Sequence, residues 1–309
     1  MSQPASARIL SHAPGSVPLS DEALQAIEAR LRAAGDLPGA PVAQQIELLH
    51  AFAALDVGRF LLQNHGLDAH WTHEVVTYTP DGPRGSAAGP LERRIFETLP
   101  TVLATRERFG IFRAQLQQHV RPGARMASVP CGHMGELLLL DHGAAPDAAI
   151  VGIDLDAGAL QGAEALARER GLADRVTLRQ EDAWQLPASA DFDVLASNGL
   201  NIYEPDDARV TALYQCFHGA LRPGGTLVTS FLTPPPGLSP ESPWDMARLD
   251  PQALAFQQLL FMRLIEARWS ALRTHATTRG QLEAAGFTDI AFIDDRARLF
   301  PTVVARRPG

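Results

Sequence analysis

The sequence predicts an α/β fold in which a doubly wound, mostly parallel sheet follows an N-terminal helical region. Up to about residue 120, apolar residues recur at helical spacing. After that point, apolar runs of strand length alternate with helical stretches joined by short turns. Such alternation indicates a parallel sheet covered on both faces, with right-handed crossovers. With 309 residues, 46% of them hydrophobic, the chain is long enough to bury a large core.

The first region, 20–119, is predicted to form a helical cap. Ser20 and the two acidic residues after it indicate the N-terminus of an amphipathic helix that ends at Gly35. Further helical patterns cover about 46–66, a shorter aromatic segment from 71, and 91–119 with an interruption at Pro100, whereas 81–86 is predicted to be a surface loop. Residues 1–19 are expected to be disordered or extended.

The second region, 120–309, supplies the sheet. Strands are predicted at 125–130, 148–154, 175–181, 191–197, 225–232, 288–294 and 299–306, and helices at about 135–142, 157–171, 206–221 and 278–285. Three prolines at 234–236 stiffen a connection in an insertion, 233–273, that ends in a long predicted helix at about 251–272.

The charged residues narrow the chemistry. The net charge is −8, and all 27 basic residues are arginine, so the chain has no lysine. This excludes Schiff-base chemistry, pyridoxal-phosphate attachment, a Walker-type phosphate loop and the lysine of protein kinases. The doublets at 93–94 and 294–295 are interpreted as solvated surface.

The composition also predicts partners and location. Acidic and basic residues are mixed without a basic run, so no nucleic-acid partner is expected. No apolar stretch approaches about 18 residues and the first ten residues lack a signal-peptide pattern, so neither a membrane partner nor export is expected. Two cysteines cannot build a disulfide framework, which favours a cytoplasmic protein. A homodimer is left open.

Polar and glycine-rich turns follow four predicted strands at the sheet edge where ligands of doubly wound folds bind. After the first strand, the turn at 131–135 contains glycines that permit close approach of a ligand to the backbone. Asp154 follows the second strand and can accept hydrogen bonds from ribose hydroxyls. Asp182 and Trp184 follow the third, where they can accept from an exocyclic amine and cover a purine face. A polar segment at 197–205 follows the fourth.

The segment from about 109 to 232 resembles the class I S-adenosylmethionine-dependent methyltransferases of the small-molecule type. The matching motifs are the turn Cys131 to Gly135, Val151-Gly152-Ile153-Asp154, Glu181-Asp182-Ala183-Trp184, Phe192-Asp193-Val194-Leu195 and Leu221-Arg222-Pro223-Gly224-Gly225-Thr226-Leu227. The resemblance implies a Rossmann-like, seven-stranded sheet with an antiparallel last strand, and S-adenosyl-L-methionine as cofactor. It implies methylation of a small acceptor, amino-acid-like or a secondary metabolite, at nitrogen, sulfur or oxygen.

The resemblance also implies roles for particular residues. Asp154 would hold the ribose, Asp182 the adenine amino group, and Gly132 and Gly135 would lie against the methionyl part. The candidate cofactor-binding residues are Cys131, Gly132, Asp154, Leu155, Asp182, Ala183, Trp184, Asn198, Arg106 and Arg108.

One position departs from the family pattern. The acidic residue that usually precedes the turn is missing, because Ser128 and Pro130 stand where it is expected. Arg106 and Arg108 are therefore candidates for holding the methionyl carboxylate, since a guanidinium can bind a carboxylate through two hydrogen bonds.

Candidates for chemistry and acceptor binding lie in two segments. Tyr203, His73 and Asn201 are the predicted catalytic residues, with His73 or Tyr203 as a base for acceptors that lose a proton. The predicted substrate-binding residues are Trp71, Tyr78, His133, Asn201 and Tyr203. No metal is expected, since Asp206 and Asp207 are interpreted as a helix cap.

Two other functions stay open at this point. A catalytically inactive methyltransferase-like binding protein is compatible with the irregular glycine turn. An NAD(P)-dependent oxidoreductase would also place an acid at Asp154, but the Gly-x-Gly-x-x-Gly spacing is absent.

Overall fold

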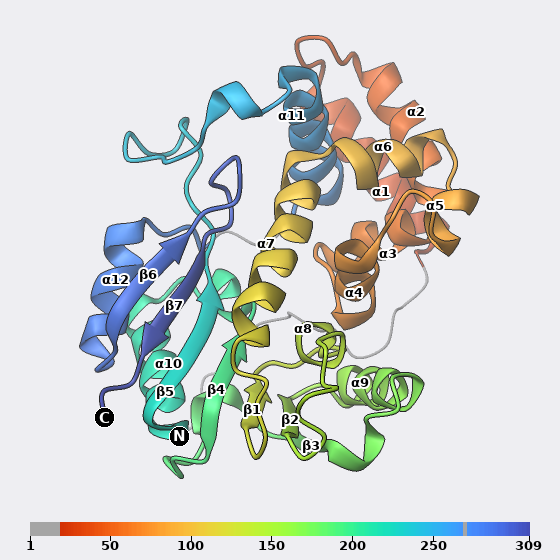
Figure 1. Cartoon of the computed structure of the whole chain (residues 1–309). Helices are drawn as coiled ribbons and strands as arrows, with labels where there is room; N and C mark the ends of the chain where they lie inside the picture. The colour runs from red at the N-terminus through yellow and green to blue at the C-terminus, as the bar shows by residue number, and fades with distance from the viewer. Residues whose placement is uncertain (1–18, 268–270) are drawn as a thin grey trace, which may run out of the picture.

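The computed structural model describes residues 19–267 and 271–309, so the predicted extension at 1–19 lies, except for Leu19, outside the described residues. Seven strands form one sheet in the order β3-β2-β1-β4-β5-β7-β6. The first five pair in parallel, and β7 runs antiparallel to both of its neighbours (Figure 1). The predicted Rossmann-like fold with an antiparallel last strand is confirmed. The strands are β1 (Arg125–Ser128), β2 (Ala149–Asp154), β3 (Val176–Gln180), β4 (Phe192–Ser197), β5 (Leu221–Ser230), β6 (Thr288–Ile293) and β7 (Thr302–Arg306).

Helices cover both faces of the sheet, as the alternation predicts. α7 (Pro100–Gln117), α8 (Gly135–Leu138) and α9 (Ala157–Glu169) share one buried core with the sheet. α10 (Asp207–Ala220) and α12 (His275–Ala284) share the core on the opposite face. Short helices η1 (Ala173–Arg175), η2 (Ala183–Gln185) and η3 (Leu200–Tyr203) lie in the connections. The carboxyl ends of β1, β2 and β4 thus remain accessible between the two layers.

The cap lies beyond these carboxyl ends (Figure 1). Its first part comprises α1 (Asp21–Ala34), α2 (Val42–Ala53), α3 (Asp56–Asn64), α4 (Ala69–Thr77), α5 (Pro83–Ala87) and α6 (Pro90–Thr98). Its second part comes from the insertion, where η4 (Met246–Arg248) precedes α11 (Pro251–Gln258) and the π-helix η5 (Leu259–Ile265). Both parts bury apolar side chains in one cluster, so the cap is assembled from segments far apart in the chain. The 18-residue α7 connects it to β1.

Three predicted elements are wrong in extent. The pattern at 46–66 is two helices, because Leu55 is extended and the backbone of Gly58 packs so closely on Phe52 that no Cβ would fit. The predicted loop at 81–86 contains α5, which Pro83 opens with its fixed φ. The predicted helix at 251–272 changes to π spacing at 259 and ends at Glu266, which has a φ of +53°.

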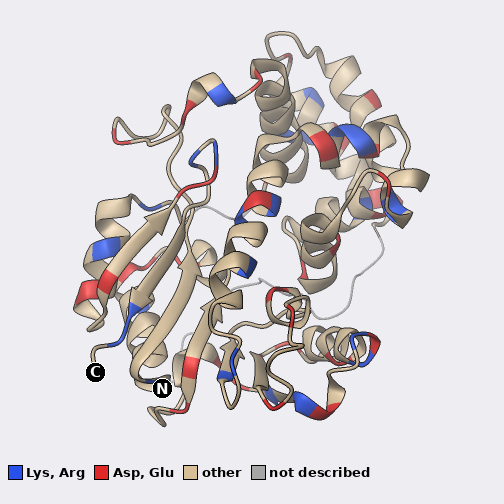
Figure 2. Ribbon diagram, viewed as in Figure 1, with Lys and Arg blue, Asp and Glu red and all other residues tan. Residues whose placement is uncertain are grey.

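The predicted helix at 135–142 is also shorter, since α8 ends at Leu138. Charged positions occur in both the cap and the sheet layer of the described chain (Figure 2). Across the described part of the chain, no helix combines the length and the apolar character that crossing a bilayer would require.

Candidate functional site

The turn after β1 is shaped by two residues in the left-handed region. Gly132 has a φ of +50° and Met134 a φ of +56°. The side chains of Cys131 and Met134 are buried against Gly152 of β2, where an added Cβ would lie 3.1 Å from each sulfur atom. The two sulfur-containing side chains of the turn are therefore buried against β2, and the turn backbone faces the cap. Burial raises the pKa of the Cys131 thiol, so this residue is not an activated nucleophile.

Helix α4 of the cap lies directly over this turn. A Cβ built on Gly132 would lie 3.7 Å from the Cβ of Ala69, and one built on Gly135 would lie 3.2 Å from Nδ1 of His73. The His73 ring also lies 5.3 Å from that of His133, centroid to centroid. The cap thus forms a roof over the backbone that the sequence predicts to meet a ligand.

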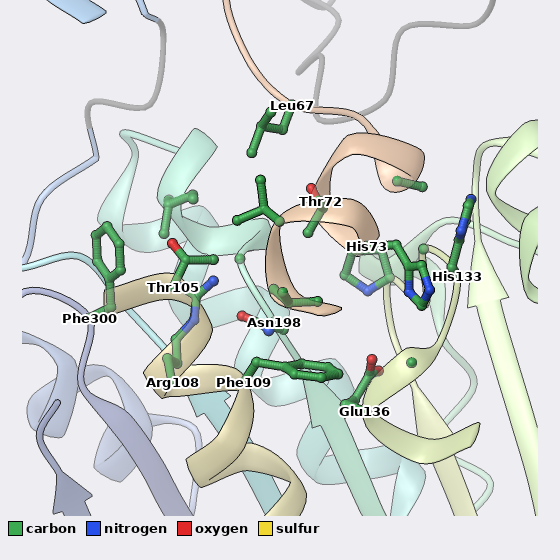
Figure 3. A pocket seen from close by; sticks show the side chains of 18 of the residues that line it. Leu67, Thr72, His73, Thr105, Arg108, Phe109, His133, Glu136, Asn198 and Phe300 are labelled. Carbon is green, nitrogen blue, oxygen red and sulfur yellow. The ribbon is translucent and has the colours of Figure 1, made fainter. Parts of the chain in front are cut away.

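A pocket opens between this roof and the carboxyl ends of β1 and β4 (Figure 3). Polar and titratable side chains line it together with apolar walls from α7, η5 and the loop before β7. The lining includes Thr72, His73, Thr101, Thr105, Arg108, Phe109, Cys131, Gly132, His133, Glu136, Asn198, Tyr203, Leu232, Phe261 and Phe300. A concave, mostly apolar pocket with a few convergent polar groups is typical of small-molecule sites.

Asp154 anchors the turn from the end of β2. Its carboxylate accepts the Gly132 amide at 2.9 Å and the Asp156 amide at 3.0 Å, one on each oxygen. Each carboxylate oxygen can accept a second hydrogen bond, so capacity for two hydroxyls remains. The next residue, Leu155, is 67% exposed, which is unusual for a large apolar residue beside a buried strand.

Glu136 reaches back to the end of β1. It is buried, lines the pocket, and contacts the Ser128 hydroxyl through Oε1. Burial raises its pKa, and no cation pairs with it among the described residues. An acidic group therefore stands beside the position where the family's acid is missing, supplied by α8 rather than by β1.

Arg108 approaches the pocket from α7. Its residue is 6% exposed, Nη1 donates a long 3.4 Å hydrogen bond to the Ser230 hydroxyl, and the buried Nε has no hydrogen-bond partner. The guanidinium carbon lies 5.2 Å from the centroid of the Phe300 ring. Desolvation lowers the pKa of Arg108 to about 10, so the group stays charged at neutral pH.

Two further titratable groups line the pocket. Burial lowers the pKa of His73 below its usual 6.5, so the imidazole is neutral at pH 7 and can accept a proton. Burial raises the pKa of Tyr203 to about 12, so its hydroxyl stays protonated at neutral pH and can donate a hydrogen bond. His73 is therefore the better candidate of the two predicted bases, because it can accept a proton at neutral pH.

The comparisons with known proteins agree with this geometry. The family model described as a methyltransferase domain matches residues 128–225, which include the glycine turn, Asp154, Asp182 and Asn198. The chain belongs to the class I S-adenosylmethionine-dependent methyltransferases. It is an S-adenosylmethionine-dependent enzyme, and S-adenosylmethionine is its cofactor.

Solved structures extend the comparison to the cap. A possible exported protein from Bordetella parapertussis is 58% identical, with 93% of this chain and 95% of that chain covered and a TM-score of 0.90. A putative O-methyltransferase from Nostoc punctiforme is 18% identical, with 84% and 71% covered and a TM-score of 0.50. The S-adenosylmethionine-dependent methyltransferase SibL is 18% identical, with 91% and 77% covered and a TM-score of 0.52, and these two share the fold. A search of curated proteins finds no match.

The residues present fit the cofactor of this methyltransferase family. The exposed Leu155 offers an apolar surface for a flat base, and the free lone pairs of Asp154 suit ribose hydroxyls. The open backbone at Gly132 and the unpaired carboxylate of Glu136 suit a methionyl chain that ends in an ammonium. These residues would hold the cofactor along the ends of β2 and β1.

The structure brings only part of the predicted site together. His73, Arg108, Cys131, Gly132, His133, Asn198 and Tyr203 line the pocket, whereas Asp154, Leu155, Asp182, Ala183 and Trp184 lie beyond it at the ends of β2 and β3. Asp182 uses its carboxylate to cap η2 and to accept from the Gln185 side chain, and the Trp184 indole donates to the Arg209 carbonyl.

Four further predicted site residues also lie outside the pocket lining. Arg106 donates to the carbonyls of Val75 and Phe96 and packs on the ring of Tyr78. Tyr78 and Trp71 are buried in the cap core. The Asn201 amide donates to the Tyr214 hydroxyl and the Ser230 carbonyl. The Tyr78 hydroxyl donates to Glu97, so Arg106, Tyr78 and Asn201 all have polar partners within the protein and stabilise the walls of the site from behind.

The interpretation of 294–295 as solvated surface is wrong for Asp295. This residue is 2% exposed, and its carboxylate accepts the amides of Ala297 and Phe300, which fixes the loop before β7. The reasoning from sequence also missed Glu136 as a pocket residue. An acid directly after the last glycine of a turn that lacks its usual acid was the available signal.

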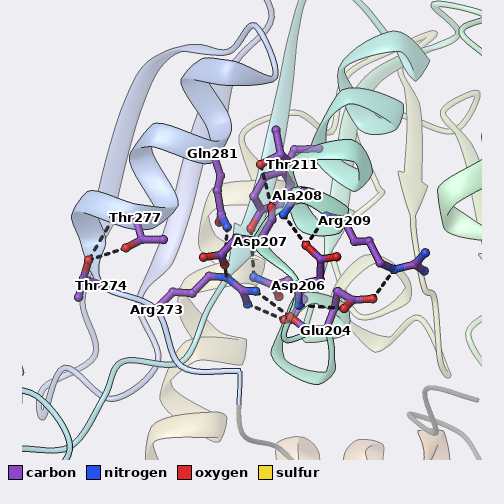
Figure 4. Close-up of polar contacts among 12 residues, drawn as sticks. Glu204, Asp206, Asp207, Ala208, Arg209, Thr211, Arg273, Thr274, Thr277 and Gln281 are labelled. Carbon is purple, nitrogen blue, oxygen red and sulfur yellow. Dashed lines mark hydrogen bonds and ion pairs between the residues drawn. The ribbon is translucent and has the colours of Figure 1, made fainter. Parts of the chain in front are cut away.

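A second arginine fixes the polar segment after β4 (Figure 4). Arg273 is 4% exposed; its Nη1 and Nη2 donate to the carbonyls of Asn201 and Glu204 at 2.9 and 2.7 Å, and its Nε donates to Asp207 at 2.8 Å. Asp206 caps α10 as predicted, through the amides of Ala208 and Arg209. Tyr203 is therefore held in place by contacts on both sides of it in the chain.

Proposed function

We propose that the enzyme transfers the methyl group to a small molecule enclosed in the pocket under the cap. The observation that carries this proposal is the roof: α4 contacts the glycine turn through Ala69 and His73, and η5 contributes Phe261 to the pocket wall. A side chain of a folded protein or a nucleotide in an RNA would have to pass this roof. A compact acceptor fits the space without displacing a helix.

The protein's own contribution is alignment and exclusion of water. S-adenosylmethionine supplies a methyl group that its sulfonium already activates. Glu136 would hold the methionyl end of the cofactor and Asp154 its ribose, and Phe109 and the α4 roof would shield the region between them from water. Holding an acceptor atom in line under such a roof is worth several kcal/mol of activation free energy, on the order of 7 for a well-oriented pair.

The acceptor atom determines whether a base takes part. A thioether or tertiary amine loses no proton, whereas an ammonium or hydroxyl does. His73 is neutral at pH 7 because burial lowers its pKa, and it lines the pocket, so we assign it the proton in the second case. Tyr203 keeps its proton and orients the acceptor as a hydrogen-bond donor. Nitrogen, sulfur and oxygen all remain candidates.

The test is label transfer with fractionated acceptors. The enzyme and methyl-labelled S-adenosylmethionine are incubated with the part of a bacterial extract below 1 kDa and, separately, with the macromolecular part. We expect label in the small-molecule fraction. Label in the macromolecular fraction alone would contradict a small acceptor, and cofactor binding without transfer to either fraction would favour an inactive binding protein. A cytoplasmic location and a homodimer stay predictions.

A further inference from the structure

The pocket has two polar ends that carry opposite charge (Figure 3). Glu136 lies at the end of β1, and Arg108 lies beside Ser230, the last residue of β5. The sheet order places β4 between these two strands, so the two ends are separated by two strand spacings, about 10 Å. Asn198, directly after β4, lies between them and accepts a hydrogen bond from the Ser230 hydroxyl at 3.1 Å.

Arg108 carries a buried charge that the protein does not neutralise by contact. No carboxylate of the described residues forms an ion pair with it, and its Nε is buried without a partner. Asp295 attracts it over a longer distance, but both oxygens of that carboxylate already accept backbone amides. A buried guanidinium without a contacting anion is costly, and an anionic ligand with two oxygens in one plane would relieve that cost.

The position of Arg108 separates it from the cofactor's own carboxylate. The methionyl part of the cofactor would lie against the glycine turn at β1, where Gly132, Gly135 and Glu136 would hold it. Arg108 lies on the other side of Asn198, at the end of β5, and the Phe300 ring lies against its guanidinium. The positive charge of Arg108 lowers the pKa of Tyr203, although burial raises that pKa by more. An acceptor would occupy this side of the pocket, and the end of β4 would lie between it and the methionyl part of the cofactor.

We infer that the methyl acceptor carries a carboxylate, which the Arg108 guanidinium binds while another atom of the same molecule receives the methyl group. This inference rests on the proposed function and specifies its substrate class. Val102, Leu232, Phe261 and Phe300 give the same pocket apolar walls, and the Phe300 ring lies against the guanidinium. The acceptor is therefore a compact acid with an apolar body, and the carboxylate itself is the anchor rather than the methylated group.

The experiment measures acid preference directly. The enzyme is saturated with S-adenosylhomocysteine and titrated, by ligand-observed NMR, with benzoate, phenylacetate, hexanoate and N-acetylglycine and with the carboxamide of each. We expect at least one acid to bind tenfold more tightly than its amide, and Arg108→Met to abolish that preference. The Arg108→Lys variant keeps the charge but loses the two-point geometry, and we expect it to retain part of the preference.

A matched control comes from the same helix. Arg106→Met removes an arginine that does not line the pocket, and we expect it to change neither the acid preference nor the affinity for S-adenosylhomocysteine by more than threefold. Equal binding of acids and amides by the unaltered enzyme would overturn the inference. So would a tenfold loss of S-adenosylhomocysteine affinity in Arg108→Met with the acid preference intact, because Arg108 would then belong to the cofactor. Failure of the unaltered enzyme to bind S-adenosylhomocysteine would instead count against the proposed function.

Discussion

Two buried arginines, Arg273 and Arg108, show how differently this protein uses the same side chain. Both are less than one-tenth exposed. Arg273 donates to two carbonyls and one carboxylate, all within 2.9 Å, and so binds the segment after β4 to the start of α10. Arg108 makes one long hydrogen bond to a hydroxyl and leaves its Nε without a partner.

The difference separates structural from ligand-binding roles. A buried guanidinium whose donors are all used stabilises the fold, because removing it would leave the acceptors unpaired. A buried guanidinium that lines a pocket and makes one long hydrogen bond adds little to the free energy of unfolding and is available to a ligand. The two residues therefore make opposite predictions for stability and for binding.

The largest expected effect is on stability. Arg273→Met should lower the free energy of unfolding by about 3 kcal/mol, because it leaves the Asn201 and Glu204 carbonyls buried without donors. Arg108→Met should lower it by less than about 1 kcal/mol. Urea unfolding followed by circular dichroism measures both. Equal destabilisation by the two variants would show that Arg108 is structural.

The next effect concerns the cofactor. Asp154→Ala should weaken binding of S-adenosylhomocysteine by about 1–3 kcal/mol, because the Gly132 and Asp156 amides lose their acceptor and the ribose hydroxyls lose theirs. Isothermal calorimetry measures the change. Asp156→Ala, which removes only the cap of α9, is the control and should leave the affinity within threefold. Unchanged affinity in Asp154→Ala would mean that the ribose lies elsewhere.

Glu136 gives a smaller effect on the same ligand. Glu136→Gln keeps the shape and the contact with Ser128 but removes the negative charge, so affinity for S-adenosylhomocysteine should fall about tenfold, a loss of about 1.4 kcal/mol. The loss should shrink when the methionyl ammonium is absent, as in 5′-methylthioadenosine. An equal loss for both ligands would assign Glu136 to folding of the turn.

The smallest effect is a change in pH dependence. For an acceptor that loses a proton, kcat should fall as the pH drops through the lowered pKa of His73, below about 6.5, because the imidazole then becomes protonated. His73→Gln should lose this acidic limb and show a lower plateau. A kcat profile from pH 5 to 8 measures it, and an unchanged limb in the variant would assign the titration to another group.

Local signals predicted the ends of the strands well and the faces of the helices poorly. Asp154, Asp182 and Asn198 follow apolar strands, and each lies at the carboxyl edge of the sheet as expected. Arg106 and Arg108 could not be distinguished from sequence. Two positions along a helix differ by about 200°, so one arginine faces the cap core and the other faces the pocket.

Tertiary packing decided the remaining misplacements. Trp71 and Tyr78 are polar-tipped aromatics near a loop, a pattern compatible with a substrate wall, but the cap core buries them. Asp295 is the second residue of a charged doublet that follows the edge strand β6, and its burial depends on the loop that it ties to Phe300. Glu136 depends on the tight turn at Met134 that returns α8 to Ser128. The contacts of Asp295 and Glu136 span only five and eight residues, but they depend on the conformation of the intervening loop or turn, which no periodic pattern indicates.

The divided construction of the cap has a consequence for synthesis of the chain. The Arg30 guanidinium in α1 donates to the carbonyls of Arg263 and Leu264, which lie 233 and 234 residues later. The apolar faces of α1 to α6 therefore emerge from the ribosome long before α11 and η5 arrive to cover them. During that interval the nascent N-terminal half exposes surface that favours aggregation, so the complete cap is among the last parts of the molecule to form.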